Sequence, residues 1–134
     1  MSYEKRFSIM DGIEVPNLRK NEFEELFDDY INHYPDSEII KRCKSYFLMK
    51  DNQKITSDDL YDFLNDDGIL LNDEFLDSVY IGNRIFEIGE DSPSCARIIT
   101  TLSVFPTIPN YIFDFIQKCF PEYHINRYLI NWVL

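Results

Sequence analysis

Apolar residues in this chain recur mainly at the spacing of an α-helix, and this periodicity constrains the fold more than any other feature. In the stretch 21–34, aromatic and aliphatic side chains fall on one stripe at intervals of three and four residues. Similar stripes occupy 39–47, 60–64, 112–120 and 125–133. Each stripe needs another apolar surface to cover it. The sequence therefore predicts a mostly α fold, either a single-domain multi-helix bundle or a short array of helical pairs, over residues 1–134.

Capping residues and prolines set the expected limits of the helices. Asn21 and Glu24 have the spacing of a capping box at the start of the first helix, and Pro35 ends it. Thr56 is a natural cap for the third helix, and Gly68 is a natural stop. The expected helices cover about 21–34, 37–49, 56–68, 72–88, 110–120 and 122–134.

Two parts of the chain allow a second interpretation. Residues 1–20 are expected to form an irregular N-terminal segment, with a short strand as the alternative. Between 72 and 88 the apolar residues keep helical spacing, but Gly82-Asn83 is also a two-residue hairpin signal. Ser92 and Pro93 have the pattern of a helix start, but the stretch 97–105 that follows is rich in β-branched residues, which favour a strand as the alternative. The alternative fold is therefore α+β, with a small antiparallel sheet in 79–105.

The negative charge of the chain is concentrated in its middle. The formal net charge is −11. Residues 1–20 carry a balance of +1 and residues 91–134 a balance of zero, so the acidic helical part, 21–90, holds −12. Such a charge steers cationic partners towards the protein and repels nucleic acid, whose binding depends on Lys and Arg. The part 91–134 is neutral and apolar.

No residue pattern points to catalysis or to a cofactor. The two histidines, His33 and His124, lie in no metal-binding spacing, and no phosphate-binding or dinucleotide-binding glycine motif occurs. Cys43, Cys95 and Cys119 are odd in number and far apart, which indicates reduced thiols in the cytoplasm rather than a disulfide framework. No signal peptide and no apolar run of about 20 residues is present. We therefore expect neither an enzyme nor a membrane or nucleic-acid partner.

Residues 63–74 partly resemble the calcium loop of the EF-hand. Asn65, Asp67 and Glu74 fall on ligand positions, and Gly68 falls on the turn position. The first ligand position is Phe63, however, which has no oxygen to offer a calcium ion. A helix followed by a glycine stop explains the same residues, so the sequence predicts no metal site.

Acidity, abundant aromatic residues and the absence of catalytic groups favour a binding protein. An acidic domain of this kind suits a basic surface, such as the one a nuclease presents to its polyanionic substrate. We therefore expect an acidic inhibitor of a basic protein partner, of the bacterial immunity or antitoxin type, that blocks a cognate nuclease-like toxin. The alternatives are an inhibitor that a phage encodes against a host defence nuclease, and an adaptor module that docks through the apolar C-terminal half. The expected partner-binding residues are Glu22, Glu25, Asp28, Asp29, Asp58, Asp59, Asp62, Asp66 and Asp67.

Overall fold

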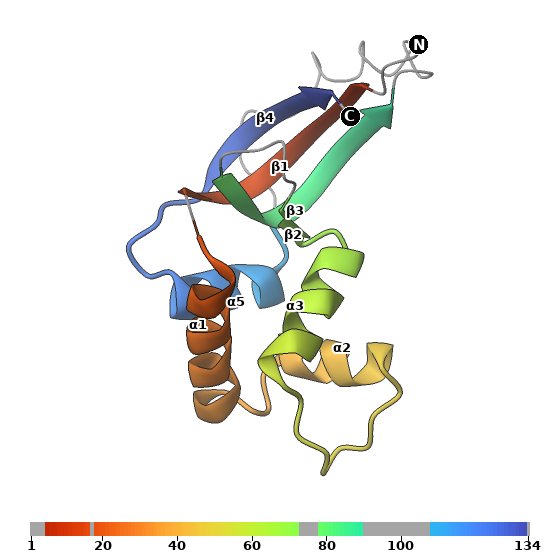
Figure 1. The fold of residues 1–134 in the computed structure, drawn as a ribbon, viewed down its shortest axis with the longest axis vertical. Helices are drawn as coiled ribbons and strands as arrows, with labels where there is room; N and C mark the ends of the chain where they lie inside the picture. The colour runs from red at the N-terminus through yellow and green to blue at the C-terminus, as the bar shows by residue number, and fades with distance from the viewer. Residues whose placement is uncertain (1–4, 17, 73–77, 90–107, 134) are drawn as a thin grey trace.

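The protein has an α+β fold, so the mostly α prediction was wrong and the α+β alternative is closer. A computed structural model describes residues 5–16, 18–72, 78–89 and 108–133. Within these ranges a four-stranded antiparallel sheet stands on a layer of four helices (Figure 1). The helices are α1 (Lys20–His33), α2 (Glu38–Tyr46), α3 (Ser57–Asp66) and α5 (Asn110–Cys119). The strands are β1 (Lys5–Pro16), β2 (Leu70–Leu71), β3 (Ser78–Gly89) and β4 (Asn126–Val133).

The sheet has the strand order β2-β3-β1-β4, with the N-terminal strand in its middle. β1 pairs antiparallel with β3 from Arg6 to Pro16, with a shift in register after Ile9. Its first part also pairs with β4, from Lys5 opposite Val133 to Gly12 opposite Asn126. The end of β1 near Pro16 and the start of β3 lie over the helices, and the other ends project away from them (Figure 1). The segment 1–20, expected to be largely irregular, therefore supplies the central strand.

Two glycines allow β1 and β3 to approach closely at the point where the sheet leaves the helices. Gly12 and Gly82 are directly opposite each other. A Cβ atom on Gly12 would lie 2.0 Å from the carbonyl oxygen of Ile81, and a Cβ atom on Gly82 would lie 2.1 Å from that of Asp11. No side chain fits between the strands here, so both positions require glycine.

The prediction of a helix through 78–88 was wrong, because this segment is the long strand β3. Val79 and Ile81 are buried over the helices, while Tyr80 lies on the opposite face and donates a hydrogen bond from its hydroxyl to Glu14 Oε2 at 2.6 Å. Gly82-Asn83 is not a hairpin turn either, since the strand continues through it. The sheet is also not confined to 79–105: β1 and β4 lie outside that stretch, and residues 90–107 are not among those the structure describes.

The last predicted helix, 122–134, was also wrong, because Asn126–Val133 is the edge strand β4. A helical stripe would place Tyr128 and Leu129 together on the apolar face. In the strand, neighbouring residues point to opposite faces. Leu129 is accordingly 65% exposed, whereas Ile130 is only 3% exposed and packs with Met10.

The pairing of β1 with β4 includes a buried ion pair. Asp11 is completely buried, and both of its carboxylate oxygens accept hydrogen bonds from Arg127. The distances are 2.8 Å from Nε to Oδ1 and 2.9 Å from Nη2 to Oδ2. This bidentate geometry holds β4 in register on the central strand.

The helices α1, α2, α3 and α5 confirm the corresponding sequence predictions to within a few residues. α3 begins with a capping box in which Thr56 and Asp59 exchange hydrogen bonds. α1 begins one residue earlier than expected, because Arg19 rather than Asn21 is its capping residue and pairs with Glu22. Their apolar faces meet the sheet in one core around Phe27.

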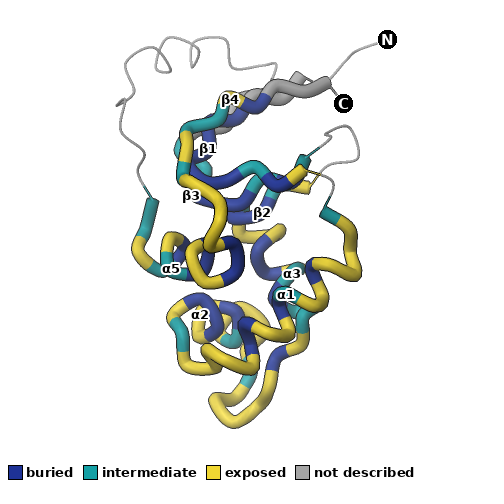
Figure 2. The backbone as a smooth tube through the Cα atoms, turned by 90° about the vertical axis from the view of Figure 1, so that its left-hand side faces the viewer, coloured by how far each residue is buried: buried dark blue, intermediate teal, exposed yellow. Residues whose placement is uncertain are grey.

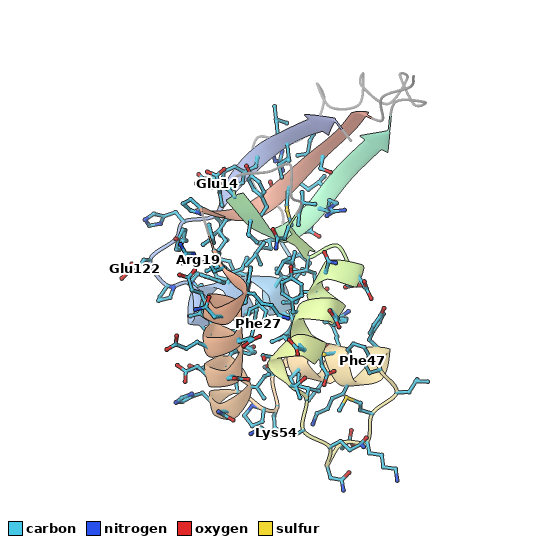
Figure 3. The ribbon with its side chains drawn as sticks, in the orientation of Figure 1. Glu14, Arg19, Phe27, Phe47, Lys54 and Glu122 are labelled. Atoms are coloured by element: carbon cyan, nitrogen blue, oxygen red, sulfur yellow. The ribbon has the colours of Figure 1, made fainter. Side chains whose placement is uncertain are left out.

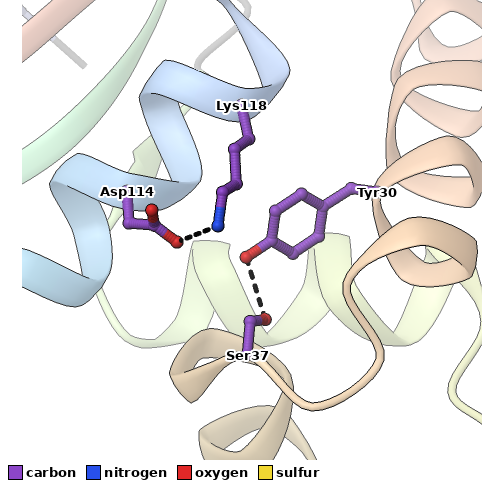
Figure 4. A network of polar contacts seen from close by, with 4 residues as sticks. All are labelled: Tyr30, Ser37, Asp114 and Lys118. Carbon is purple, nitrogen blue, oxygen red and sulfur yellow. Dashed lines mark hydrogen bonds and ion pairs between the residues drawn. The ribbon is translucent and has the colours of Figure 1, made fainter.

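Polar contacts fix α5 and α2 around α1 (Figure 4). The hydroxyl of Tyr30 donates a hydrogen bond to Ser37 at 2.8 Å, and Lys118 pairs with Asp114 at 2.9 Å on α5. Lys118 also lies 4.3 Å from the ring centre of Tyr34. The ring of Tyr30 meets Phe115 edge to face at 4.9 Å. These contacts join α1 to the start of α2 and to α5.

Candidate protein-binding surface

The structure places eight of the nine predicted partner-binding residues in solvent. The four on α1 are exposed, as are Asp58, Asp62, Asp66 and Asp67 on or directly after α3. Asp59 is only half-buried, and its carboxylate accepts a hydrogen bond from the backbone amide of Thr56 at 3.0 Å. Asp59 is therefore engaged in capping α3. Figure 2 shows that exposed residues are frequent along the helices, whereas the middle of β1 is buried.

The four acidic residues of α1 do not all face α3. Successive helical residues are turned by about 100°, so residues four apart share a side of the helix. Glu24 lies beside α3, and Asp28 follows it on the same side. Glu25 and Asp29 lie farther round the helix, and Asp29 is close enough to Cys119 of α5 to raise the pKa of its thiol. Burial raises the pKa of the Cys119 thiol to about 12, and the negative charge of Asp29 adds to this rise.

A cavity of about 510 Å³ lies between α1 and α3. Phe23 and Tyr61 form an aromatic wall, with ring centres 5.3 Å apart in an edge-to-face arrangement. The hydroxyl of Tyr61 accepts a hydrogen bond from the side-chain amide of Asn72 at 2.9 Å, which fixes the ring. The cavity therefore has a preformed aromatic surface.

Charged groups surround this aromatic wall. The carboxylates of Glu24, Asp58 and Asp62 line the cavity together with the ammonium group of Lys20. With three negative groups and one positive group, the cavity favours a cation. Sequence reasoning missed Glu24 because its spacing from Asn21 suggested a capping role. Only the packing of α1 against α3 brings it to Asp58 and Asp62.

A second exposed feature follows the end of α2. Tyr46, Phe47 and Leu48 are 47%, 36% and 91% exposed, although all three are large and apolar. The hydroxyl of Tyr46 donates a hydrogen bond to Asp66 at 2.5 Å. The sequence predicted Tyr46 and Phe47 on the apolar stripe of a helix that reaches about Met49, so their exposure was not foreseen, whereas Leu48 lies outside that stripe.

The histidine, cysteine and calcium-loop residues that could have carried chemistry are explained by their places in the fold. His33 is exposed at the end of α1, with Nδ1 2.8 Å from the backbone oxygen of Asp29. Cys43 is fully buried, and burial raises the pKa of its thiol to about 12. Phe63, at the first position of the calcium-loop resemblance, packs in the core, and Glu74 lies outside the described residues. Within the described ranges, no three His, Cys, Asp or Glu side chains are grouped to hold a metal ion.

Comparisons with protein-family models, with curated proteins and with solved structures find no match. None of the helices in the described part of the chain has the length and apolar character needed to cross a membrane. The features that bear on function are the cavity between α1 and α3 and the exposed residues at the end of α2.

Proposed function

We propose that this protein is an acidic inhibitor that binds and neutralises a basic protein partner. Its role would be that of a bacterial immunity or antitoxin-type protein that blocks a nuclease-like toxin in the cytoplasm. The observation that supports this proposal best is the cavity between α1 and α3, in which three carboxylates stand around the aromatic wall of Phe23 and Tyr61.

An arginine or lysine side chain of the partner matches this cavity chemically. Its charge is attracted to Glu24, Asp58 and Asp62, and its planar or apolar part can lie against the rings of Phe23 and Tyr61. Such an insertion orders few side chains of the inhibitor, because the hydrogen bond from Asn72 already fixes Tyr61.

The excess of acidic residues in 21–90 adds a long-range attraction to this local site. Opposite charges on two proteins accelerate their encounter, and salt weakens the effect because screening shortens to about 8 Å near physiological ionic strength. Covering the basic surface of a nuclease would exclude its nucleic-acid substrate. Inhibition then needs no catalytic group in the inhibitor.

The adaptor alternative receives less support from the described residues. On α5, Ile112, Phe115 and Ile116 are buried in the common core. On β4, Ile130 is also buried. These four residues stabilise the fold, and the exposed apolar side chains of the same half, Phe113, Tyr123 and Leu129, belong to α5, to the segment after it and to β4.

The test compares two charge reversals that change the net charge equally. Glu24→Lys with Asp62→Lys removes two carboxylates from the cavity, whereas Glu25→Lys with Asp29→Lys reverses two acids elsewhere on α1. Each variant is co-expressed with the product of the neighbouring gene, and binding kinetics are measured at two salt concentrations. We expect the cavity variant to lose affinity by a factor of about ten or more and to lose protection of the cell. The control should mainly slow association at low salt.

Equal binding by the cavity variant and the parent would contradict the role of the cavity. If both variants bind as tightly as the parent, and salt does not change the binding, the electrostatic proposal as a whole is contradicted. Circular dichroism spectra and melting temperatures close to those of the parent establish that both variants are folded.

A further inference from the structure

The turn after α2 contains a leucine where the backbone favours glycine. The amide of Met49 donates a hydrogen bond to the carbonyl of Lys44 at 2.8 Å, and the amide of Leu48 donates one to Ser45 at 3.2 Å. These two bonds form a Schellman motif, in which the penultimate residue adopts a left-handed conformation. Leu48 has a φ of 55°, and among the described residues it is the one non-glycine with positive φ. Glycine is the usual residue at this position because it has no Cβ atom.

The Leu48 side chain contributes little to the packing of the fold. Leu48 is 91% exposed, the highest value among the large apolar residues whose exposure the structure gives. Its neighbour Met49 is half-buried and packs against the core, so Met49 makes the apolar contact that usually accompanies this motif. A strained backbone position and a fully solvated leucine are both unfavourable in the isolated protein. A local outlier of this kind is a reason to look for a role in binding.

Leu48 belongs to a group of three exposed apolar residues. Phe47 and Tyr46 precede it, and their rings meet edge to face with centres 4.8 Å apart. We call these three residues, 46–48, the apolar tip. In Figure 3, Phe47 lies at the end of α2 on the side away from α1; its side chain is 36% exposed. The tip is therefore a compact apolar projection with aromatic support.

Acidic groups of α3 border the apolar tip on one side, and Lys41 and Arg42 of α2 line the groove that also contains Tyr46 and Asp67. Tyr46 donates its hydroxyl hydrogen to Asp66 at 2.5 Å. This hydrogen bond raises the pKa of Tyr46, and the charges of Asp66, Asp62 and Asp67 contribute to the same rise. Asp62 also lines the cavity between α1 and α3. The tip and the cavity consequently share one acidic border along α3.

We propose that the apolar tip inserts into an apolar socket, bordered by lysine or arginine, on the basic protein partner. The inference rests on the proposed function and adds to it the anchor that holds the complex together. Charge complementarity selects this occupant. A second copy and an anionic lipid surface would both bring like charges together, because the net charge of −11 outweighs the local positive charges of Lys41 and Arg42. Apolar and aromatic side chains buried at the centre of an interface commonly dominate its binding energy.

The test is the substitution Leu48→Gly, which has opposite expected effects on the free protein and on the complex. Glycine relieves the left-handed backbone, so the melting temperature should rise by about 3 °C. Removal of the anchor should accelerate dissociation from the neighbouring gene product by a factor of about ten or more, with little effect on association. Leu129→Thr is the matched control, because Leu129 is 65% exposed on β4, far from the tip (Figure 1). Its affinity should equal that of the parent.

The remaining outcomes distinguish this inference from the proposed function. If Leu48→Gly dissociates like the parent while Glu24→Lys with Asp62→Lys still weakens binding, the tip is no anchor and the proposed function stands. A lower melting temperature for Leu48→Gly would show a structural role and remove the premise. A concentration-dependent dimer that Leu48→Gly abolishes, or binding to phosphatidylglycerol vesicles that it abolishes, would assign the tip to a second copy or to lipid and overturn the inference.

Discussion

Replacing Gly82 with alanine places a methyl group in the main chain of β1. The new Cβ atom would lie 2.1 Å from the carbonyl oxygen of Asp11 and 2.6 Å from the Cα atom of Gly12. Real Cβ atoms essentially never approach other heavy atoms within 3.0 Å. The strands must therefore separate by roughly 1 Å, because main-chain atoms cannot rotate away as the end of a side chain can. Gly82 also donates its amide hydrogen to the carbonyl of Ile69 at 2.8 Å, so the shift disturbs a hydrogen bond on the other side as well.

We expect Gly82→Ala to lower the free energy of unfolding by about 3 kcal/mol, the upper end of the usual cost of overpacking. For a chain of this size that corresponds to a fall of roughly 10 °C in melting temperature. Gly12→Ala should behave alike, since its Cβ atom would lie 2.0 Å from the oxygen of Ile81. The double variant should cost less than the sum of the two, because strands already separated accept the second methyl group more easily. Urea and thermal unfolding of all three variants measure these differences.

Gly68→Ala is the matched control for the loss of a glycine. Gly68 has a φ of +75°, but a Cβ atom there would have no neighbour closer than 4.0 Å. Only backbone strain is added, at a cost of about 1 kcal/mol. If Gly12→Ala and Gly82→Ala melt within about 2 °C of the parent, β1 and β3 are not in the described contact and the argument from close approach is refuted.

Three further predictions concern buried groups. Arg127→Met removes the two hydrogen bonds that the fully buried Asp11 accepts from the guanidinium, and the free energy of unfolding should fall by about 2 kcal/mol; an unchanged urea midpoint would contradict the importance of the pair. Burial raises the thiol pKa of Cys43 and Cys119 from 9.0 to about 12, so the folded state keeps protons that the unfolded state releases. Stability should therefore be unaffected by these thiols below about pH 9 and should fall from there towards pH 12. In a Cys95→Ser background, a thiol reagent at pH 8 should not label the native protein, and it should label Cys43 and Cys119 once urea unfolds the chain. Rapid labelling of the native protein would contradict the burial of these thiols.

The local sequence was sufficient to locate the helices. α1, α3 and α5 have an apolar stripe whose spacing matches the helical repeat, and α3 has in addition the Thr56–Asp59 capping box. These signals work because a helix satisfies its backbone hydrogen bonds within four residues, and its cap lies within the same short window. Seven of the nine predicted binding residues lie on exposed helical positions for the same reason; Asp59 is half-buried, and Asp67 follows the end of α3.

The functional surface was only partly foreseeable. Periodicity placed Asp58 and Asp62 in solvent, but it contained no sign that Glu24 lies beside them around Phe23 and Tyr61. That arrangement depends on the packing of α1 against α3. Tyr46 and Phe47 were likewise expected to be buried, because aromatic residues in phase with an apolar stripe normally are. Their exposure follows from the end of α2 at Tyr46.

The sheet was decided by the tertiary structure. The residues of β4 fit a helical stripe as well as a strand, and what selects the strand is the free edge of β1, more than 100 positions earlier in the chain. Gly12 and Gly82 are equally uninformative alone, because each is explained only by the backbone of the other strand. A helix closes its hydrogen bonds within its own segment, so its sequence determines it. A strand receives its hydrogen bonds from distant residues, so only the assembled fold determines which segments become strands.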